Sequence, residues 1–456
     1  MKRPINFLKN LAGFGEGHER TNRAKKNIAA SFVIKGFSIL ISLLLVPMTI
    51  NYVNPTRYGI WITLSSIIGW FGFFDIGFGN GLRNKFAEAI AKGEKELART
   101  YVSTTYAILS IIIGIILVLF LIINPLLNWA KLLNTTSDMA GELSILALIV
   151  FVFFCIQFVL QLITTILTAD QKPAKASYFN LLGSVFSLAV IFIITKTTQG
   201  SLLYLGLALG FAPILVLTTS SLWFYNRDYK NYAPSFKYIK FSYAKDLMNL
   251  GIKFFIIQIA AVFLYQSNNL IITQIYGPKE VTTYNIAFKY FGIIPMLFSI
   301  VTSPFWSAYT EAYYKKETEW IKRTIKSLII IWLMICVLSI IMLIFSNVIY
   351  RFWIGINIKV PFSLSLVCAL YSIIVTWSSI FLSFINGIGK IFIQLYLTVI
   401  VIFVNIPLAI FLSKYLNLGI SGVLLATCID FLMFAIVIPI QYQKIIKNNA
   451  IGIWNK

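Results

Sequence analysis

The segments FAEAIAKGEKE (residues 86–96) and YTEAYYKKETE (residues 309–319) are two copies of one charged motif. The pairs that align at one constant offset are Glu88 with Glu311, Ala89 with Ala312, Lys92 with Lys315, Glu94 with Glu317, Glu96 with Glu319 and, upstream, Pro55 with Pro278. A motif that returns once, half a chain later, indicates an internal duplication. We therefore predict two halves of similar architecture; a chance match between two charged loops is the alternative.

Long apolar runs precede and follow both copies. We count about twelve such runs, each roughly 20 or more residues long, which is enough for a helix to cross about 30 Å of hydrocarbon. Helices are expected because they satisfy their own backbone polar groups in lipid. Hydrophobic residues make up 59% of the chain and charged residues 12%, and the mean hydropathy is +0.83. The sequence therefore predicts an all-α polytopic membrane protein with about twelve transmembrane helices, and a soluble core is excluded.

The distribution of basic residues predicts how the chain is oriented. Most of the 38 lysines and arginines fall in alternate gaps between the apolar runs. Positively charged loops stay in the cytoplasm, so both termini are expected to be cytoplasmic. The net charge of +22 is spread over short loops rather than gathered on one folded surface. This spread favours anionic membrane lipids over nucleic acid as partners.

The runs and the charged gaps give the domain organisation. The predicted segments are a cytoplasmic basic leader (1–26), an N-lobe with the first six spans (27–223), a cytoplasmic basic linker (224–248), a C-lobe with the last six spans (249–440) and a cytoplasmic tail (441–456). Because an even number of spans separates the repeated motifs, the two six-helix lobes should be related by a pseudo-two-fold axis along the membrane normal. Aromatic residues among the lysines of the linker predict a short helix or turn in the membrane interface.

Several spans carry polar residues at helical spacing. The polar faces include Lys35 and nearby serines in the first span, Gln157 and Gln161 in the fourth, Gln258, Gln266 and Asn269 in the seventh, and Ser372 and Thr376 in the tenth. Such faces must turn away from lipid, toward other helices or toward water. Helix packing explains a single Ser/Thr face well. The Gln and Asn residues, present in both lobes, favour a hydrated cavity between the lobes.

Charged residues within the spans point the same way, because each costs at least about 2.5 kcal/mol at a helix centre unless it is paired or hydrated. Lys35 and Lys289 lie near span ends, so either side chain could extend to the head groups. Asp430 lies near the middle of the last span, and its short side chain cannot reach them. We interpret Asp430 as a functional or cavity-lining residue, with a structural ion pair as the alternative.

The run DIGFGNGLRNK (residues 75–85) ends the second span. Its glycines resemble a phosphate-binding loop, but no strand precedes the run and the GxxxxGK pattern is absent, so nucleotide binding is poorly supported. A helix end where two backbones approach closely explains the glycines better. Arg83 should face the cytoplasm and could pair bidentately with an anionic head group. A simple positive-inside anchor is the alternative for this residue.

Catalytic and metal chemistry find little support in the sequence. Cys155, Cys336, Cys368 and Cys428 each lie in an apolar run without a CxxC pair, and His18, the only histidine, stands in the polar leader. The acids well inside spans, Asp75 and Asp430, fall in different lobes. No metal site, cofactor or enzymatic activity is therefore expected.

Three stretches, together with Pro47, carry the resemblance to a known family. They are NIAASFVIKGFS (residues 27–38), RYGIWITLSS (residues 57–66) and the glycine-rich run that begins at Asp75. They resemble polysaccharide flippases of the Wzx type, which carry O-antigen or capsule repeat units and belong to the multidrug/oligosaccharidyl-lipid/polysaccharide exporter superfamily. The specific likeness covers the first part of the chain, and the two-lobe plan extends it over the remainder.

The resemblance implies a transporter that moves an undecaprenyl-pyrophosphate-linked oligosaccharide from the cytoplasmic to the periplasmic leaflet of a bacterial inner membrane by alternating access. Lys35, Arg83 and Lys289 would neutralise the pyrophosphate. The candidate glycan contacts are Trp70, Gln157, Gln161, Gln258, Gln266 and Asn269. Asp75 and Asp430 are candidates for coupling to H⁺ or Na⁺. Other membrane proteins of glycan assembly are further candidate partners.

Three alternatives remain open. A lipid II flippase of the same superfamily usually has additional spans and a more basic cavity. A drug/cation antiporter would favour acids and aromatic residues, whereas this chain places bases as well as acids in its spans. A membrane enzyme of glycan assembly would need a catalytic cluster and a sizeable outer loop, and the sequence offers neither.

Overall fold

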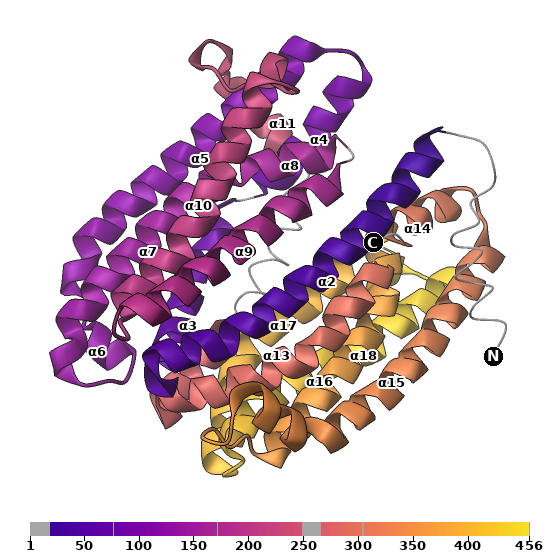
Figure 1. Ribbon diagram of the computed structural model, residues 1–456. Helices are drawn as coiled ribbons and strands as arrows, with labels where there is room; N and C mark the ends of the chain where they lie inside the picture. Colours follow the sequence, from indigo (N-terminus) through magenta and orange to yellow (C-terminus); the bar gives the residue numbers. More distant parts are fainter. Residues whose placement is uncertain (1–18, 76, 171, 249–265, 303–304, 456) are drawn as a thin grey trace. The chain divides into compact units, whose positions relative to one another are not determined.

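The computed structural model describes residues 19–75, 77–170, 172–248, 266–302 and 305–455, and within them the chain forms helices and turns but no strand (Figure 1). Ten described segments are long and apolar enough to cross a membrane. They are Val33–Val53, Lys95–Leu126, Ser137–Ala169, Pro173–Thr197, Leu202–Asn226, Pro278–Thr302, Thr318–Ile354, Phe362–Gly387, Phe392–Tyr415 and Gly419–Ile446. The prediction of a multi-pass helical membrane protein is thus confirmed, while the number twelve stays a prediction.

The chain divides into two compact units, Met1–Ile256 and Ile257–Lys456. We call them the N-terminal and C-terminal units and describe each by itself. The division falls close to the end of the basic linker predicted at 224–248. The seventh predicted span, near Asn249, begins outside the described residues.

The N-terminal unit is a helical bundle. Its main helices are α2 (Glu19–Val53), α3 (Pro55–Gly69), α4 (Phe78–Ala91), α5 (Lys95–Ile123), α7 (Ala140–Leu160), α8 (Leu162–Ala169), α9 (Pro173–Thr197) and α10 (Leu202–Asn226), with the short helices η1 (Trp70–Asp75), η2 (Asn124–Leu126), α6 (Trp129–Leu132) and η3 (Ser137–Met139) between them. α9 packs against both α2 and α10, and α10 also packs against α7. α4 lies between α5 and α8.

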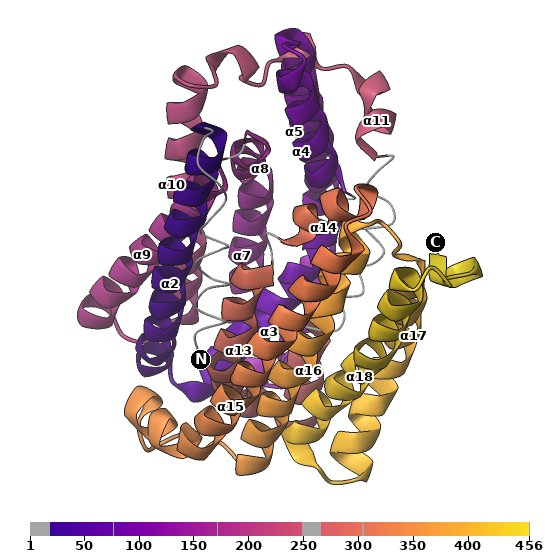
Figure 2. The same cartoon turned by 90° about the vertical axis from the view of Figure 1, so that its right-hand side faces the viewer.

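The C-terminal unit is built around one central helix (Figure 2). Its elements are the helical residues 266–276, α13 (Pro278–Thr302), α14 (Phe305–Tyr314), α15 (Thr318–Ile354), α16 (Phe362–Gly387), α17 (Phe392–Ile410), the π-helical turn η7 (Phe411–Tyr415), α18 (Gly419–Ile446) and η8 (Gly452–Asn455). α16 contacts α13, α14, α15 and α18, and α18 also packs against α17. These neighbours cover most of α16, which explains why it is deeply buried.

The repeated motif produces the same turn in both units. The chain passes from α4 to α5 through Gly93, with φ 76°, and from α14 to α15 through Lys316, with φ 58°. In each turn the next residue donates its N–H to a carbonyl five residues back, Glu94 to Ala89 and Glu317 to Ala312, both at 2.9 Å. Left-handed backbone at this position is easy for glycine and costly for lysine. The sequence match therefore reflects matching backbone geometry.

The aligned prolines begin equivalent helices. Pro55 starts α3 and Pro278 starts α13, where a missing N–H costs nothing because the first turn has free donors. The preceding residues, Asn54 and Gly277, both have positive φ, 77° and 86°. The two units thus share two independent local signatures.

The second predicted span, beginning near Gly59, is interrupted. α3 ends at Gly69, and six residues of 3₁₀ helix lead to Asp75 before α4 begins. The glycine-rich run also allows the close approach that its composition predicts. A Cβ on Gly81 would lie 2.0 Å from the carbonyl oxygen of Leu247, so the backbone of residue 247 rests directly on α4.

The predicted linker is docked rather than extended. After α10 the chain forms η4 (Lys230–Tyr232), η5 (Phe236–Tyr238), η6 (Phe241–Tyr243) and α11 (Ala244–Met248), and these short elements pack against α4, α5 and α10. The sequence predicts a short helix or turn here, and the structure forms several. The division at 224–248 therefore marks a change in composition, while the chain remains part of the N-terminal unit to its last described residue, Met248.

Candidate functional site

A buried carboxylate lies inside the C-terminal unit. Asn405 of α17 donates from Nδ2 to Oδ2 of Asp430 of α18 over 2.5 Å. Asp430 has no exposed surface, and Asn405 is 2% exposed. No lysine or arginine within the described ranges forms an ion pair with Asp430. The carboxylate is therefore held by one neutral donor in the middle of a membrane-spanning helix.

Amide and hydroxyl side chains extend this site along α18, one helical turn before Asp430. Thr427 precedes Asp430 by three residues on α18, so both lie on the same side of the helix. Asn268 donates from Nδ2 to Oη of Tyr284 at 3.2 Å and to Oγ1 of Thr427 at 3.1 Å. The cluster thus joins three elements, residues 266–276, α13 and α18, and reaches α17 through Asn405. We call Asn268, Tyr284, Asn405, Thr427 and Asp430 the C-unit polar cluster.

Three oxygens of the C-unit polar cluster accept no hydrogen bond from the described residues. They are the Oδ1 atoms of Asn268, Asn405 and Asp430. Leaving a buried acceptor unsatisfied costs about 1–3 kcal/mol. Carboxylate and amide oxygens are the ligands that hard cations prefer, and a carboxylate can instead take up a proton. The cluster therefore has the chemistry to hold Na⁺ or H⁺. In the described part of the chain, no group of three or more His, Cys, Asp and Glu side chains forms a metal site.

Asp75, the second coupling candidate, has a structural contact in the N-terminal unit. Its Oδ1 accepts the backbone N–H of Gly79 at 2.8 Å, which satisfies a free donor in the first turn of α4. A carboxylate at this position also complements the positive end of the helix. A Cβ on Gly79 would lie 3.1 Å from Oδ2 of Asp75, so this glycine leaves room for the carboxylate. Asp75 is thus engaged by backbone, whereas Asp430 has one side-chain partner.

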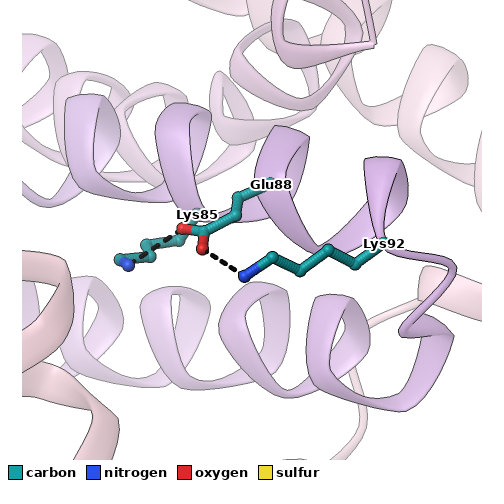
Figure 3. Close-up of polar contacts among 3 residues, drawn as sticks. All are labelled: Lys85, Glu88 and Lys92. Atoms are coloured by element: carbon teal, nitrogen blue, oxygen red, sulfur yellow. Dashed lines mark hydrogen bonds and ion pairs between the residues drawn. The ribbon is translucent and has the colours of Figure 1, made fainter.

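The charged motif at 86–96 forms a surface ion-pair network (Figure 3). Glu88 pairs through Oε1 with Nζ of Lys92 at 2.7 Å and through Oε2 with Nζ of Lys85 at 3.0 Å. The hydrogen bond from Lys92 and then that from Lys85 lower the pKa of Glu88 to about 2. The contact with Glu88 raises the pKa of each lysine. Glu88 therefore engages both lysines, while Arg83, exposed on the same helix, forms no ion pair with any described residue.

The three basic candidates for pyrophosphate are divided between the units. Lys35 lies on α2 and Arg83 on α4, both in the N-terminal unit, and Lys289 lies on α13 in the C-terminal unit. Lys35 and Lys289 are half-buried, and Arg83 is exposed. Their shared role in binding pyrophosphate stays a prediction.

The glycan candidates of the N-terminal unit lie where its own helices leave side chains partly uncovered. Gln157 is half-buried on α7, and Gln161 is exposed where α7 meets α8. The carbonyl of Gln161 accepts both the N–H of Thr164, at 2.9 Å, and its hydroxyl, at 2.7 Å, which holds the junction together. Trp70 is half-buried where α3 passes into η1. These positions are compatible with contact to a ligand.

The glycan candidates of the C-terminal unit differ among themselves. Gln266 is half-buried. Asn269 is buried, and its Oδ1 accepts from Nδ2 of Asn285 at 2.9 Å, so packing within the unit already uses it. Gln258 lies outside the described residues.

Helix packing explains Ser372 and Thr376 on the polar face of the tenth predicted span. Ser372 and Thr376 of α16 have no exposed surface. Ser372 donates from Oγ to the carbonyl of Phe291 on α13 at 3.1 Å, and Thr376 donates to the carbonyl of Ser372 at 2.7 Å. This is the alternative that the sequence left open for Ser/Thr faces.

Sequence reasoning missed Asn405, Thr427 and Asn268 as partners of the Asp430 site. Asn405 lies within an apolar run, and a polar amide at membrane depth is itself a signal of a partner. Thr427 could have been found from its spacing to Asp430. The signal was present, but nothing in the sequence ties residue 405 to residue 430.

The comparisons with known proteins agree with this architecture. The profile of a family described as "Polysaccharide biosynthesis protein" matches residues 24–307. A Yersinia pseudotuberculosis protein whose name refers to O-antigen export is 21% identical over 369 residues, 77% of this chain and 80% of that protein. A Salmonella typhi protein named for O-antigen transport is 20% identical over 307 residues, 65% of this chain and 67% of that protein.

Solved structures show the same fold. An inward-facing multidrug resistance MATE family transporter of the MOP superfamily aligns with a TM-score of 0.75 over 92% of this chain and 98% of its own, at 15% identity. A Vibrio cholerae MATE transporter in its bent form aligns with a TM-score of 0.63 over 95% of this chain and 100% of its own, at 13% identity.

Proposed function

The chain belongs to the polysaccharide biosynthesis protein family, and from that premise we propose that it is a flippase for a lipid-linked oligosaccharide. It moves an undecaprenyl-pyrophosphate-linked O-antigen or capsule repeat unit from the cytoplasmic to the periplasmic leaflet of a bacterial inner membrane. Movement proceeds by alternating access and is coupled to H⁺ or Na⁺.

The observation that carries this proposal is the family match together with relatives named for O-antigen export and transport over most of their length. The chain is a multi-pass membrane protein with the fold of known transporters. A pyrophosphate and several sugars cannot cross hydrocarbon unaided, because charged and hydroxyl groups are costly to move out of water. A polytopic helical protein that carries polar side chains within its spans is suited to this task.

The substrate head group is assigned to the basic residues. Lys35, Arg83 and Lys289 contact the pyrophosphate, and Arg83 makes the first contact because its guanidinium is exposed and can pair bidentately with phosphate oxygens. Anionic lipids compete for the same residue. The sugar hydroxyls are bound by the candidates that are at least partly exposed, Gln157, Gln161 and Gln266, while the aromatic ring of Trp70 stacks on a sugar face.

The coupling ion is assigned to the C-unit polar cluster. Asp430 supplies a buried carboxylate, and Asn405 and Asn268 supply amide oxygens that have no donor within the described residues. Binding a cation or proton relieves the cost of these unsatisfied acceptors. Asp75 remains the second candidate, and its bond to the N–H of Gly79 makes it the weaker one.

Deleting the gene in its host tests the proposal. The expected result is loss of surface glycan together with accumulation of the lipid-linked repeat unit in the cytoplasmic leaflet. Accumulation in the periplasmic leaflet would instead place the defect in polymerisation or ligation and contradict the proposal.

An assay with purified protein in vesicles distinguishes transport of the glycan from enzymatic activity and from drug antiport. A labelled lipid-linked glycan should change leaflet without any change in its covalent structure. A covalently altered product would indicate an enzyme of glycan assembly. Cation-driven movement of drug molecules without movement of the glycan would indicate an antiporter.

A further inference from the structure

The segment that follows α10 is fixed to the N-terminal unit by backbone hydrogen bonds. We call residues 229–248 the basic strap. The N–H of Ser235 donates to Oγ of Ser103 at 3.1 Å, and the N–H of Lys240 donates to Oγ1 of Thr104 at 3.0 Å. Ser103 and Thr104 are buried residues of α5. The strap is therefore an ordered part of the surface.

Side chains add to this attachment. Arg99 of α5 donates from Nε to the carbonyl of Ala233 at 2.9 Å, and its guanidinium lies 4.5 Å from the centre of the Tyr238 ring. At the other end of the strap, Leu247 is fully buried and its carbonyl rests on Gly81 of α4. The cation–π contact thus holds the middle of the strap, and apolar burial holds its last residues.

The outer side of the strap is apolar and basic at once. Phe236 is 94% exposed and Phe241 is 56% exposed. The neighbouring lysines, Lys237, Lys240 and Lys245, are also exposed. Two aromatic rings held outward by a docked backbone, with lysines around them, form a surface that water solvates poorly and that attracts negative charge.

The attachment points place the strap at the boundary of the membrane. The strap begins three residues after α10, a candidate span that ends at Asn226. It is bonded to residues 103–104, about two turns inside the candidate span that begins at Lys95. A segment that follows the end of one span and attaches within the first turns of another is expected beside the lipid head groups, and its lysines indicate the cytoplasmic side.

We propose that the basic strap is a binding site for anionic phospholipid. Phe236 and Phe241 enter the boundary between head groups and acyl chains, and Lys237, Lys240 and Lys245 contact the lipid phosphates. None of these residues is among those assigned to the substrate, and the site anchors the cytoplasmic end of the N-terminal unit to the inner leaflet.

Photo-crosslinking in the full-length protein tests this site. Phe236 is replaced by p-benzoylphenylalanine, the protein is reconstituted in vesicles of equal phosphatidylglycerol and phosphatidylcholine, and lipid adducts are measured by mass spectrometry. A lysine near an anionic surface contributes about fivefold in local binding. We expect phosphatidylglycerol adducts to exceed phosphatidylcholine adducts at least fivefold.

Two matched variants serve as controls for the ratio of phosphatidylglycerol to phosphatidylcholine adducts. The same probe at Phe403, 74% exposed in the middle of α17, should give both lipids equally, because it samples acyl chains. The variant Lys237→Gln/Lys240→Gln with the probe at 236 should bring the ratio close to that at 403. No lipid adduct at 236, or an equal ratio without the lysine substitutions, would overturn the proposal.

Discussion

Asn405 and Asp430, on neighbouring membrane-spanning helices, share a hydrogen bond of 2.5 Å while the Oδ1 atom of each accepts none within the described residues. A carboxylate at this depth is costly unless it is neutralised or paired. Asn405 supplies a dipole but no charge. The pair therefore holds a buried carboxylate without a counter-charge among the described residues.

Replacing Asn405 by alanine should destabilise the C-terminal unit. The variant leaves the Asp430 carboxylate without its donor, which should lower the free energy of unfolding by about 1–3 kcal/mol. Thermal unfolding in detergent measures the loss. Asn180→Ala, at an exposed position of α9, should change stability by less than about 0.5 kcal/mol. Equal stability of the two variants would show that Asn405 does not support Asp430.

Neutralising Asp430 should uncouple transport from the ion gradient. Asp430→Asn keeps the shape and the contact with Asn405 but removes the titratable, cation-binding group. Gradient-driven flipping in vesicles should lose about tenfold of its stimulation, within the usual range of coupling between sites, while flipping without a gradient continues. Unchanged dependence on both sodium and pH in Asp430→Asn and in the double variant with Asp75→Asn would exclude both carboxylates.

Substitutions at Asp75 should separate capping from ion binding. Asp75→Asn retains an oxygen for the N–H of Gly79, so stability should hold. Asp75→Ala removes that acceptor and should cost about 1 kcal/mol in thermal unfolding. If Asp75→Asn retains ion-coupled transport, the role of Asp75 is to accept the N–H of Gly79 at the start of α4 and not to bind the ion. Loss of coupling in Asp75→Asn at full stability would instead support an ion-binding role.

Alanine at Gly81 should release the basic strap. The new Cβ would lie 2.0 Å from the carbonyl oxygen of Leu247, and overpacking of this kind costs about 1–3 kcal/mol. Faster tryptic cleavage after Lys237 and a lower unfolding temperature should both follow. Gly114→Ala, on α5 with open space around it, should be neutral or stabilising by up to about 1 kcal/mol. Similar behaviour of both variants would contradict the close contact.

The Glu88 network should titrate at low pH. The pKa of Glu88 lies near 2, below the ordinary value of 4.5, so its ion pairs contribute fully above pH 4.5 and are lost as the pH falls toward 2. A carboxyl ¹³C titration, assigned with Glu88→Gln, measures the midpoint. Because these groups are exposed, 1 M salt should move the midpoint toward 4.5. A midpoint near 4.5 at low salt would show that the pairs do not form.

Much of the fold could be predicted because lipid allows few solutions. Helix-length apolar runs, the motif around Glu88 and its copy near Glu317 are local signals, and the matching turns at Gly93 and Lys316 follow from them. The interruption after Gly69 was not predicted, because the apolar run continues through Trp70 and hides the change from α-helix to 3₁₀ helix.

The candidate site was predicted only in part. Asp430 stands out in the sequence because a carboxylate is rare at the centre of a span. Asn269 and Gln266 have the same polar character. Packing nevertheless buries Asn269, whereas Gln266 is only half-buried. Composition cannot separate these cases, because the two residues lie on one helix and the side chains that pack against each of them, such as Asn285 against Asn269, decide which is covered.

The sequence by itself determined that this protein crosses the membrane many times, that a charged motif of its first half returns in its second half, and which carboxylate is costly enough to require a partner. Local patterns suffice for these conclusions because the hydrogen bonds of the backbone and the hydrophobicity of the side chains are properties of single helices. Only the tertiary structure decided that Asn405 meets Asp430 and that Leu247 rests on Gly81. Those contacts join distant segments, and they form where side-chain shapes fit together across helices.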